Sequence, residues 1–363
     1  MRRDRKWMKI VCIIGALAFG GAERVMTNLV NFFSDECDVT YIAIGHRDIP
    51  AYNISGKVKF INGIEYSNKL KAVPKLRSVI LKEKPDIALS FLTLNNILTL
   101  LALLGTDIPV VISERGDPGR NTSFFRKMLR KVTYPWAKGY VFQTEDAKKF
   151  FSSKIQKKSA VIPNPVSLEK EYADYKCTNP DKIIYAVGRL EKQKNYDLMI
   201  SAFKRASNTL SDYRLVIYGD GSEKTRLGEK IREIGLEDRI QLCGSVNNVH
   251  DCIKDGAAYI LTSDFEGMPN SLMEAMAIGL CCISSDCPVG GPRMLIENGK
   301  NGFLFPTGDE DELVKIMENV ITDRGCCAKI GTEAKKIYFD YNEEIINRRW
   351  FNYLMDVLEK QNE

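Results

Sequence analysis

The chain has 363 residues, of which 44% are hydrophobic and 27% are charged. This length exceeds what one hydrophobic core usually serves, and the composition excludes a disordered chain, a collagen-like repeat and a polytopic membrane protein. The charge is uneven, because residues 1–172 hold 28 Lys and Arg against 16 Asp and Glu (+12), whereas residues 173–363 hold 24 against 31 (−7). A basic half indicates nucleic acid or an anionic membrane as partner, unless it is only a solvated surface.

Two apolar segments resemble membrane signals. Residues 1–25 have the basic-then-apolar layout of a signal peptide, but the apolar run continues into a Gly turn and helical spacing without a polar break. Residues 87–105 lack charge over about the length of a bilayer span, yet they contain polar residues and a strand pattern follows them. We expect a strand, loop and helix at the first segment, a buried strand and helix at the second, and no transmembrane span.

The ten cysteines include two adjacent pairs and no C-x-x-C, and the chain has only two histidines. This pattern favours small buried cysteines in a reducing cytoplasm over a disulfide framework. It also gives no spacing suited to a structural zinc site, so we expect no metal.

Short apolar runs alternate with longer amphipathic stretches. Runs typical of strands lie at 9–15, 38–44, 57–61, 86–91, 109–113, 139–143 and 159–162, and then at 182–187, 213–218, 239–243, 257–261, 280–284 and 302–304. Stretches typical of helices lie at 23–34, 69–84, 144–151, 194–209, 222–235, 270–278, 309–321, 325–338 and 343–359. The alternation predicts two α/β domains, each a parallel sheet with helices on both faces, joined through the proline-containing segment 163–181.

The stretch 264–279, DFEGMPNSLMEAMAIG, carries the most chemical information. A turn precedes a helix that begins near Asn270, and a helix N-terminus suits a phosphate. Glu266 is expected at the mouth of this site, and Glu274 one turn inside the helix. Because a carboxylate can accept two hydrogen bonds from a vicinal diol, a nucleoside diphosphate sugar is a natural ligand, although a loop with two unrelated glutamates remains the alternative.

This stretch resembles the E-x7-E signature of retaining glycosyltransferases of family 4, which have the two-domain GT-B architecture. The segment 188–195, GRLEKQKN, is similar to the family's G-R-L-x-x-x-K-N/G motif, and 20–24, GGAER, to its Gly-rich loop after the first strand. Residues 161–166, VIPNPV, look like the segment that closes the first domain. The likeness covers nearly the whole chain, with the motifs in the right order.

The resemblance implies roles for individual residues. Arg189 and Lys194 would grip the donor diphosphate and act as catalytic residues together with Glu266. The remaining residues expected to bind the donor are Gly20, Gly21, Gly267, Met268, Pro269, Asn270, Ser271, Leu272 and Glu274. Two cations that stabilise the leaving phosphate remove the need for a divalent metal, so no cofactor is expected. The family also implies retention by front-face attack, with a diphosphate oxygen helping to deprotonate the acceptor.

The chain departs from the family at one position. Many members carry a His after the strand that corresponds to 109–113, whereas here the strand leads into Ser113-Glu114-Arg115. Either Glu114 or Arg115 contacts the donor sugar or the acceptor instead, or neither does. His46 and His250 are expected to be structural or exposed, and no general base can be assigned.

Two basic segments, 69–84 and 120–138, each combine six Lys and Arg with apolar residues. Such segments suit an interfacial contact with an anionic membrane, although their apolar faces could equally cover the first sheet. Nucleic acid is disfavoured because no known binding module is present.

We therefore expect a GT-B fold of two Rossmann-like doubly wound domains facing a cleft. Residues 1–168 would bind the acceptor, 180–339 would bind the nucleotide sugar, and helix 340–363 would return to the first domain. The expected activity is transfer of a hexose or N-acetylhexosamine from a nucleoside diphosphate sugar, with UDP as the expected nucleotide, to a lipid-linked or cell-surface glycan such as one on polyprenyl diphosphate. The expected location is the cytoplasmic face of the cell membrane. A GT-B nucleotide-sugar epimerase and a non-catalytic nucleotide-sugar-binding protein remain alternatives.

Overall fold

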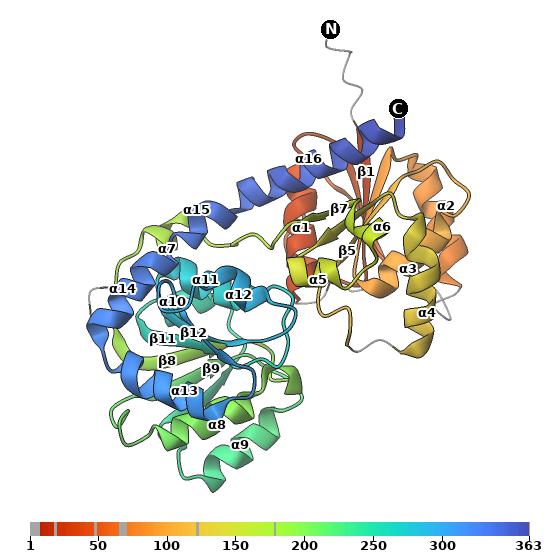
Figure 1. Ribbon diagram of the computed structural model, residues 1–363. Coiled ribbons are helices and arrows are strands. Elements are labelled where there is room, and N and C mark those ends of the chain that lie inside the picture. Colours follow the sequence, from red (N-terminus) through yellow and green to blue (C-terminus); the bar gives the residue numbers. More distant parts are fainter. Residues whose placement is uncertain are drawn as a thin grey trace. The chain divides into compact units, whose positions relative to one another are not determined.

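A computed structural model describes residues 8–17, 20–46, 49–64, 71–120, 123–177 and 179–362 (Figure 1). The chain divides into two compact units. The first unit consists of residues 1–165 and 343–363, and the second of residues 166–342. The boundary between Pro165 and Val166 lies inside the segment 163–181 that was expected to join two domains.

The described part of the first unit contains a seven-stranded parallel sheet in the order β3-β2-β1-β4-β5-β6-β7. The strands are β1 (Lys9–Ile14), β2 (Asp38–Ala43), β3 (Lys59–Asn62), β4 (Ile87–Phe91), β5 (Val110–Glu114), β6 (Gly139–Phe142) and β7 (Ser159–Val161). The helices are α1 (Gly21–Phe33), α2 (Ala72–Glu83), α3 (Thr93–Ala102), α4 (Phe124–Thr133), η1 (Tyr134–Trp136), α5 (Glu145–Lys149), α6 (Ser153–Gln156) and α16 (Glu343–Asn362). The central strands are mostly apolar and buried along nearly their whole length because helices cover both faces of the sheet.

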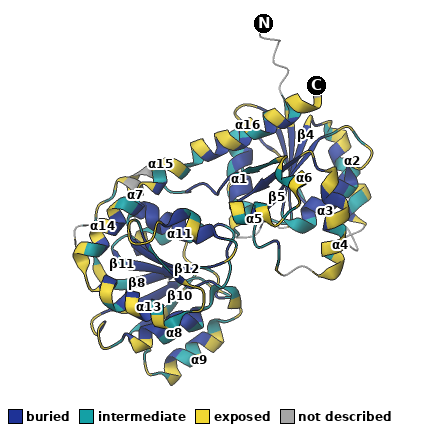
Figure 2. Cartoon of the chain, viewed as in Figure 1, coloured by how far each residue is buried: buried dark blue, intermediate teal, exposed yellow. Residues whose placement is uncertain are grey.

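The second unit contains a six-stranded parallel sheet in its described residues, in the order β10-β9-β8-β11-β12-β13. The strands are β8 (Asp181–Val187), β9 (Arg214–Tyr218), β10 (Ile240–Gly244), β11 (Gly256–Leu261), β12 (Cys281–Asp286) and β13 (Phe303–Pro306). The helices are α7 (Lys170–Asp174), η2 (Lys192–Lys194), α8 (Tyr196–Arg205), α9 (Lys224–Glu233), α10 (Val249–Ile253), α11 (Asn270–Ile278), α12 (Gly291–Leu295), α13 (Glu310–Ile316), η3 (Met317–Ile321), α14 (Arg324–Ala334) and α15 (Ile337–Tyr341). Buried residues concentrate on the strands and on α11, whereas α9 is largely exposed (Figure 2).

The C-terminal helix α16 belongs to the first unit. Ile346, Trp350 and Leu354 are fully buried there, and the Trp350 and Phe91 ring centroids lie 5.3 Å apart. The Tyr353 hydroxyl accepts a hydrogen bond from the backbone N–H of Tyr140, at 2.8 Å. The predicted pair of doubly wound α/β domains and the returning helix are thus confirmed.

The uncharged segment 87–105 forms strand β4 and helix α3, both buried, as expected. In the described part of the chain, no helix combines the length and apolar character needed to cross a bilayer.

Candidate donor site

The strand order of the second unit brings two predicted motifs together. Strands β8 and β11 are neighbours, and β9 and β12 lie on their outer sides, so the winding direction reverses between β8 and β11. Ligands of open α/β sheets bind outside the carboxyl ends of the strands at such a point. The loops that leave these two ends, 188–195 and 262–269, carry Arg189, Lys194 and Glu266.

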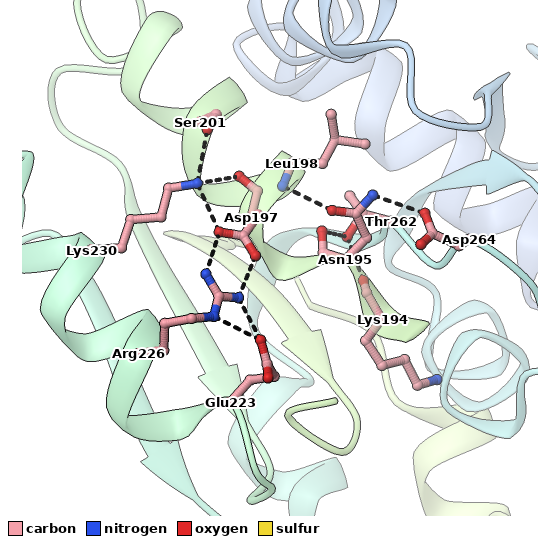
Figure 3. A network of polar contacts seen from close by, with 10 residues as sticks. All are labelled: Lys194, Asn195, Asp197, Leu198, Ser201, Glu223, Arg226, Lys230, Thr262 and Asp264. Atoms are coloured by element: carbon pink, nitrogen blue, oxygen red, sulfur yellow. Dashed lines mark hydrogen bonds and ion pairs between the residues drawn. The ribbon is translucent and has the colours of Figure 1, made fainter. Parts of the chain in front are cut away.

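The two loops are joined by direct hydrogen bonds. The Thr262 hydroxyl lies 2.9 Å from both the Lys194 and Asn195 carbonyl oxygens. The Asn195 amide donates to Asp264 Oδ1 at 2.9 Å (Figure 3). The backbone N–H of Asp264 donates to the Gln193 carbonyl oxygen at 2.9 Å. Asn195 has a left-handed conformation with φ 46°, which Asn tolerates better than most residues. These bonds fix the backbone that carries Lys194.

A network of ion pairs between α8 and α9 supports the loop that carries Lys194. Arg226 donates to both carboxylate oxygens of Asp197, with Nη1 to Oδ1 at 3.0 Å, and Lys230 Nζ lies 3.0 Å from Oδ1 (Figure 3). These hydrogen bonds, above all those from Arg226, lower the pKa of Asp197 to about 2. Because Asp197 lies in the first turn of α8, the network ties α8 to α9 just behind Lys194.

Lys194 and Glu266 form an ion pair, with Nζ and Oε1 2.6 Å apart. The two side chains are only 14% and 10% exposed. The Ser263 hydroxyl donates to the same carboxylate oxygen at 2.7 Å. The attraction between charges shielded from water is stronger than between surface charges. This contact therefore holds the ammonium group of Lys194 in one position at the carboxyl end of the sheet.

The loop before α11 is held by a neighbouring loop. The backbone N–H of Glu266 donates to the Pro288 carbonyl oxygen at 2.7 Å, and Val289 N–H donates to the Glu266 carbonyl oxygen at 3.0 Å. A Cβ atom at Gly291 would lie 2.1 Å from the Gly267 carbonyl oxygen, so only glycine allows this approach. The loop leads to the N-terminus of α11, where Pro269 is the N-cap residue and supplies no side-chain hydrogen bond.

Glu274 lies one turn into α11 and is 7% exposed. His250 Nε2 lies 3.1 Å from its Oε2 atom, so an Nε2–H would donate to the carboxylate. His250, which was expected to be structural or exposed, therefore contacts one of the residues expected to bind the donor. No sequence pattern marks it, because its short helix α10 and α11 come together only in the folded sheet.

Arg189 follows Gly188 at the end of β8 and is exposed. Its guanidinium makes no hydrogen bond to any residue within the described ranges. Gly219 and Gly221, which no sequence motif singled out, pack directly against this segment. A Cβ atom at Gly219 would lie 1.9 Å from the Gly188 carbonyl oxygen. The two glycines thus allow the backbone before and after Arg189 to pass close to the loop that follows β9.

In the first unit, helix α1 begins at Gly21, and Gly20 is its extended N-cap residue. The Gly20 N–H donates to the Tyr52 hydroxyl at 3.0 Å, and that hydroxyl donates back to the Gly20 carbonyl oxygen at 3.0 Å. Gly20 itself has no side chain with which to cap α1. These contacts fix the point at which the Gly-rich segment enters the helix.

Glu114 is buried beneath the end of β5. Its Oε2 accepts a hydrogen bond from the Thr93 hydroxyl at 2.9 Å, and its Oε1 accepts one from the Tyr134 hydroxyl. Burial raises the pKa of Glu114, while these two hydrogen bonds oppose the shift. Both oxygens therefore bind groups inside the first unit, which suits a structural role rather than a contact with a substrate.

Arg115 lies beside Glu114 in a different environment. Its Nη2 donates to Asn164 Oδ1 at 2.5 Å, and its guanidinium carbon lies 4.5 Å from the centre of the Phe91 ring. Its buried Nε and Nη1 atoms have no hydrogen-bond partner among the described residues. Burial lowers the pKa of Arg115 to about 9. Of the two residues considered for a substrate contact, Arg115 is the one with unused hydrogen-bond donors.

The two basic segments behave differently. In α2, from the segment 69–84, Leu76 and Ile80 are buried, so its apolar face covers the unit; Leu70 lies outside the described residues. In α4, from the segment 120–138, the apolar residues Phe124, Phe125, Met128 and Val132 are exposed, with Phe124 84% exposed. Arg130 instead is buried and donates to the Pro118 carbonyl oxygen at 2.8 Å.

Comparison with known families gives the same division of the chain. Residues 19–170 match the family model described as Glycosyltransferase Family 4, and residues 169–337 match the model described as Glycosyl transferases group 1. The chain has the two domains of a GT-B glycosyltransferase. The site described above, from Arg189 to Glu274, lies in the glycosyl transferases group 1 region.

Relatives and solved structures extend over nearly the whole chain. One relative is the Campylobacter jejuni GalNAc-alpha-(1->4)-GalNAc-alpha-(1->3)-diNAcBac-PP-undecaprenol alpha-1,4-N-acetyl-D-galactosaminyltransferase, 27% identical over 96% of this chain and 99% of that protein. A second is the N-acetylgalactosamine-N,N'-diacetylbacillosaminyl-diphospho-undecaprenol 4-alpha-N-acetylgalactosaminyltransferase of the same species, 28% identical over 96% and 99%. The fold is shared with the lipopolysaccharide outer core galactosyltransferase WaaB (TM-score 0.77, 22% identity, 96% and 99% covered) and with Anabaena HepE in complex with UDP (TM-score 0.77, 18% identity, 96% and 100% covered).

Proposed function

We propose that this glycosyltransferase is a retaining enzyme that moves a hexose or N-acetylhexosamine from a UDP-sugar to a glycan on a polyprenyl diphosphate carrier. The observation that carries the proposal is the arrangement in the second unit. The Lys194–Glu266 pair lies at the same end of the sheet as the N-terminus of α11, whose N-cap residue Pro269 supplies no side-chain hydrogen bond, and Glu274 lies one turn into that helix.

Three features of this end of the sheet suit a diphosphate. The N-terminus of α11 supplies partial positive charge and backbone N–H groups. Lys194 supplies a positive charge already held within the site, and Arg189 supplies a second one on an exposed side chain that can turn towards the ligand. Together they would stabilise the negative charge that develops on the leaving β-phosphate.

The two glutamates suit the sugars at either end of that diphosphate. Glu274, buried beneath the start of α11, would bind the ribose hydroxyls of the nucleotide. Glu266, paired with Lys194, would face the hexose whose anomeric carbon reacts. Binding of the donor phosphates would compete with Glu266 for Lys194, because both are anions within reach of the same ammonium group.

The proposed transfer needs no covalent bond between the sugar and a protein nucleophile. The bond between the anomeric carbon and the β-phosphate oxygen breaks, and a bond to the acceptor hydroxyl oxygen forms on the same face of the sugar. The acceptor proton passes to an oxygen of the departing diphosphate. Lys194 and Arg189 lower the energy of the leaving group, and no divalent cation takes part.

The acceptor proposal rests on the relatives and on the first unit. Two relatives over nearly the full chain are named as acting on undecaprenyl diphosphate-linked glycans, and HepE is solved with UDP. In the first unit, the buried Nε and Nη1 atoms of Arg115 have no hydrogen-bond partner among the described residues, and we assign this side chain to a polar group of the acceptor.

The exposed face of α4 supports a location at an anionic membrane. Phe124, Phe125 and Met128 are exposed on a helix that also carries the exposed Lys127 and Lys131. A helix with apolar residues on one side and cations beside them binds the interface of anionic bilayers. We place this contact at the cytoplasmic face of the cell membrane, where nucleotide sugars and polyprenyl-linked acceptors would meet.

A donor screen tests the activity. The purified chain is incubated with a panel of UDP-, GDP- and ADP-sugars and a polyprenyl diphosphate-linked glycan. The masses of the products are measured by mass spectrometry. We expect the acceptor to gain one hexose or N-acetylhexosamine from a UDP-sugar, with the donor's anomeric configuration retained by NMR. An epimerised nucleotide sugar with no change in the acceptor would contradict the proposal, and an inverted linkage would contradict retention.

A further inference from the structure

We propose that His250 is a positioning residue that orients the Glu274 carboxylate towards the ribose diol of the donor nucleotide. This inference rests on the donor site proposed above and adds to it a residue that lies 24 positions away along the chain.

The Glu274 carboxylate needs hydrogen-bond donors because it is 7% exposed. A buried carboxylate without partners is costly, and its rotation about the last side-chain bond is soft. His250 Nε2 lies 3.1 Å from Oε2, so an Nε2–H bond fixes that rotation. A carboxylate has about four acceptor sites, so the bond from His250 is compatible with two further bonds from neighbouring hydroxyls.

His250 is itself held in place. Its ring packs edge to face against Tyr172 of α7, with centroids 5.5 Å apart and an interplanar angle of 61°. The Tyr172 hydroxyl accepts a hydrogen bond from the Asn248 amide at 3.1 Å, which ties α7 to the residue before α10. A side chain fixed by packing on one side can fix its hydrogen-bond partner on the other.

The Glu274 carboxylate lies within hydrogen-bond distance of the His250 ring, with Oε2 3.1 Å from Nε2. Asp251, the next residue in α10, is occupied by Lys254 at 2.9 Å and by the Asn248 amide. Glu274 comes from α11, across the contact between the two helices. The bond requires only the tautomer that carries hydrogen on Nε2, so protonation of the ring is not needed.

Equilibrium binding of two nucleotides separates positioning from a general structural role. We would measure the affinities of UDP and of 2′,3′-dideoxy-UDP, which lacks the hydroxyls, for the full chain and its variants by calorimetry. If His250 acts through the diol, His250→Ala should weaken UDP binding about tenfold, the effect of one hydrogen bond to a charged group. The same variant should leave dideoxy-UDP binding unchanged, which also shows that the site is folded.

Conservative variants sharpen the test. The amide nitrogen of Gln reaches about as far as Nε2 of His, whereas that of Asn reaches only as far as Nδ1. His250→Gln should therefore restore UDP affinity and His250→Asn should not. In the transfer reaction, His250→Ala should raise the donor KM and leave kcat unchanged, as expected for lost ground-state binding.

Three outcomes would overturn the inference: unchanged UDP affinity in His250→Ala, equal weakening of both nucleotides, or no rescue by Gln. The donor-site proposal has a separate control. If Glu274→Gln leaves UDP affinity unchanged, the role of Glu274 fails and the inference about His250 fails with it. If Glu274→Gln weakens UDP binding and His250→Ala does not, only the inference about His250 is lost.

Discussion

Gly291→Ala tests whether transfer requires the present position of the loop that carries Glu266. The added Cβ atom would lie 2.1 Å from the Gly267 carbonyl oxygen, against the 3.0 Å below which real Cβ atoms essentially never come. The opposing atom is backbone, so the loop must move by about 0.9 Å, and Glu266 would move with it. A misplacement of about 1 Å can cost about 10²-fold in rate, so we expect kcat/KM to fall about 100-fold.

The assay compares donor affinity, initial transfer rate and melting temperature. Overpacking costs about 1–3 kcal/mol, which lowers the melting temperature by several degrees without unfolding the chain at assay temperature. Gly228→Ala, on the exposed face of α9, is the matched control, because nothing lies within 4 Å of its new Cβ atom. Wild-type transfer by Gly291→Ala would refute the role of this close approach.

Four further predictions concern charge. Lys194→Ala should lower kcat about 10²–10³-fold, since it removes a cation at the leaving group; a normal rate would refute its assignment. Asp197→Asn should destabilise the chain at neutral pH, and because the pKa of Asp197 is lowered to about 2, the difference from wild type in thermal melts should shrink as pH falls from about 4 to 2. Lys127→Glu with Lys131→Glu should release the enzyme from anionic liposomes in a flotation assay, and unaltered binding would exclude α4 as the contact. Chelation by EDTA should leave the transfer rate unchanged, and a loss restored by Mg²⁺ would overturn metal-free catalysis.

Local sequence patterns predict the strands and most of the longer helices but miss α4, α10 and α12. The strands appear in the sequence as short apolar runs, because helices cover both faces of each sheet. The longer helices appear as apolar residues at helical spacing, because each buries one face against a sheet. The helix predicted at 309–321 begins as expected, since Asp309 caps α13 by accepting a hydrogen bond from the Glu312 N–H. Such features depend on residues close together in the chain.

Contacts across the sheet could not be predicted in this way. The pairing of Lys194 with Glu266, and of His250 with Glu274, depends on β11 lying next to β8, which strand patterns alone do not state. The orientation of α4 could not be predicted from the sequence either. Its segment has the composition of a helix that could cover a sheet, but Arg130 takes the inward position and Phe124 points to solvent.

The first unit is built from two separate stretches of chain, and this has a consequence for biosynthesis. Val166 and Asn342 pair with each other, so the second unit begins and ends at one place and can fold as soon as residue 342 has emerged. The first unit must wait for the 20 residues of α16 to bury Trp350 and Leu354. A premature stop codon before α16 would therefore leave the second unit complete, although the ribosome makes most of it after the first. The first unit would lack its final helix.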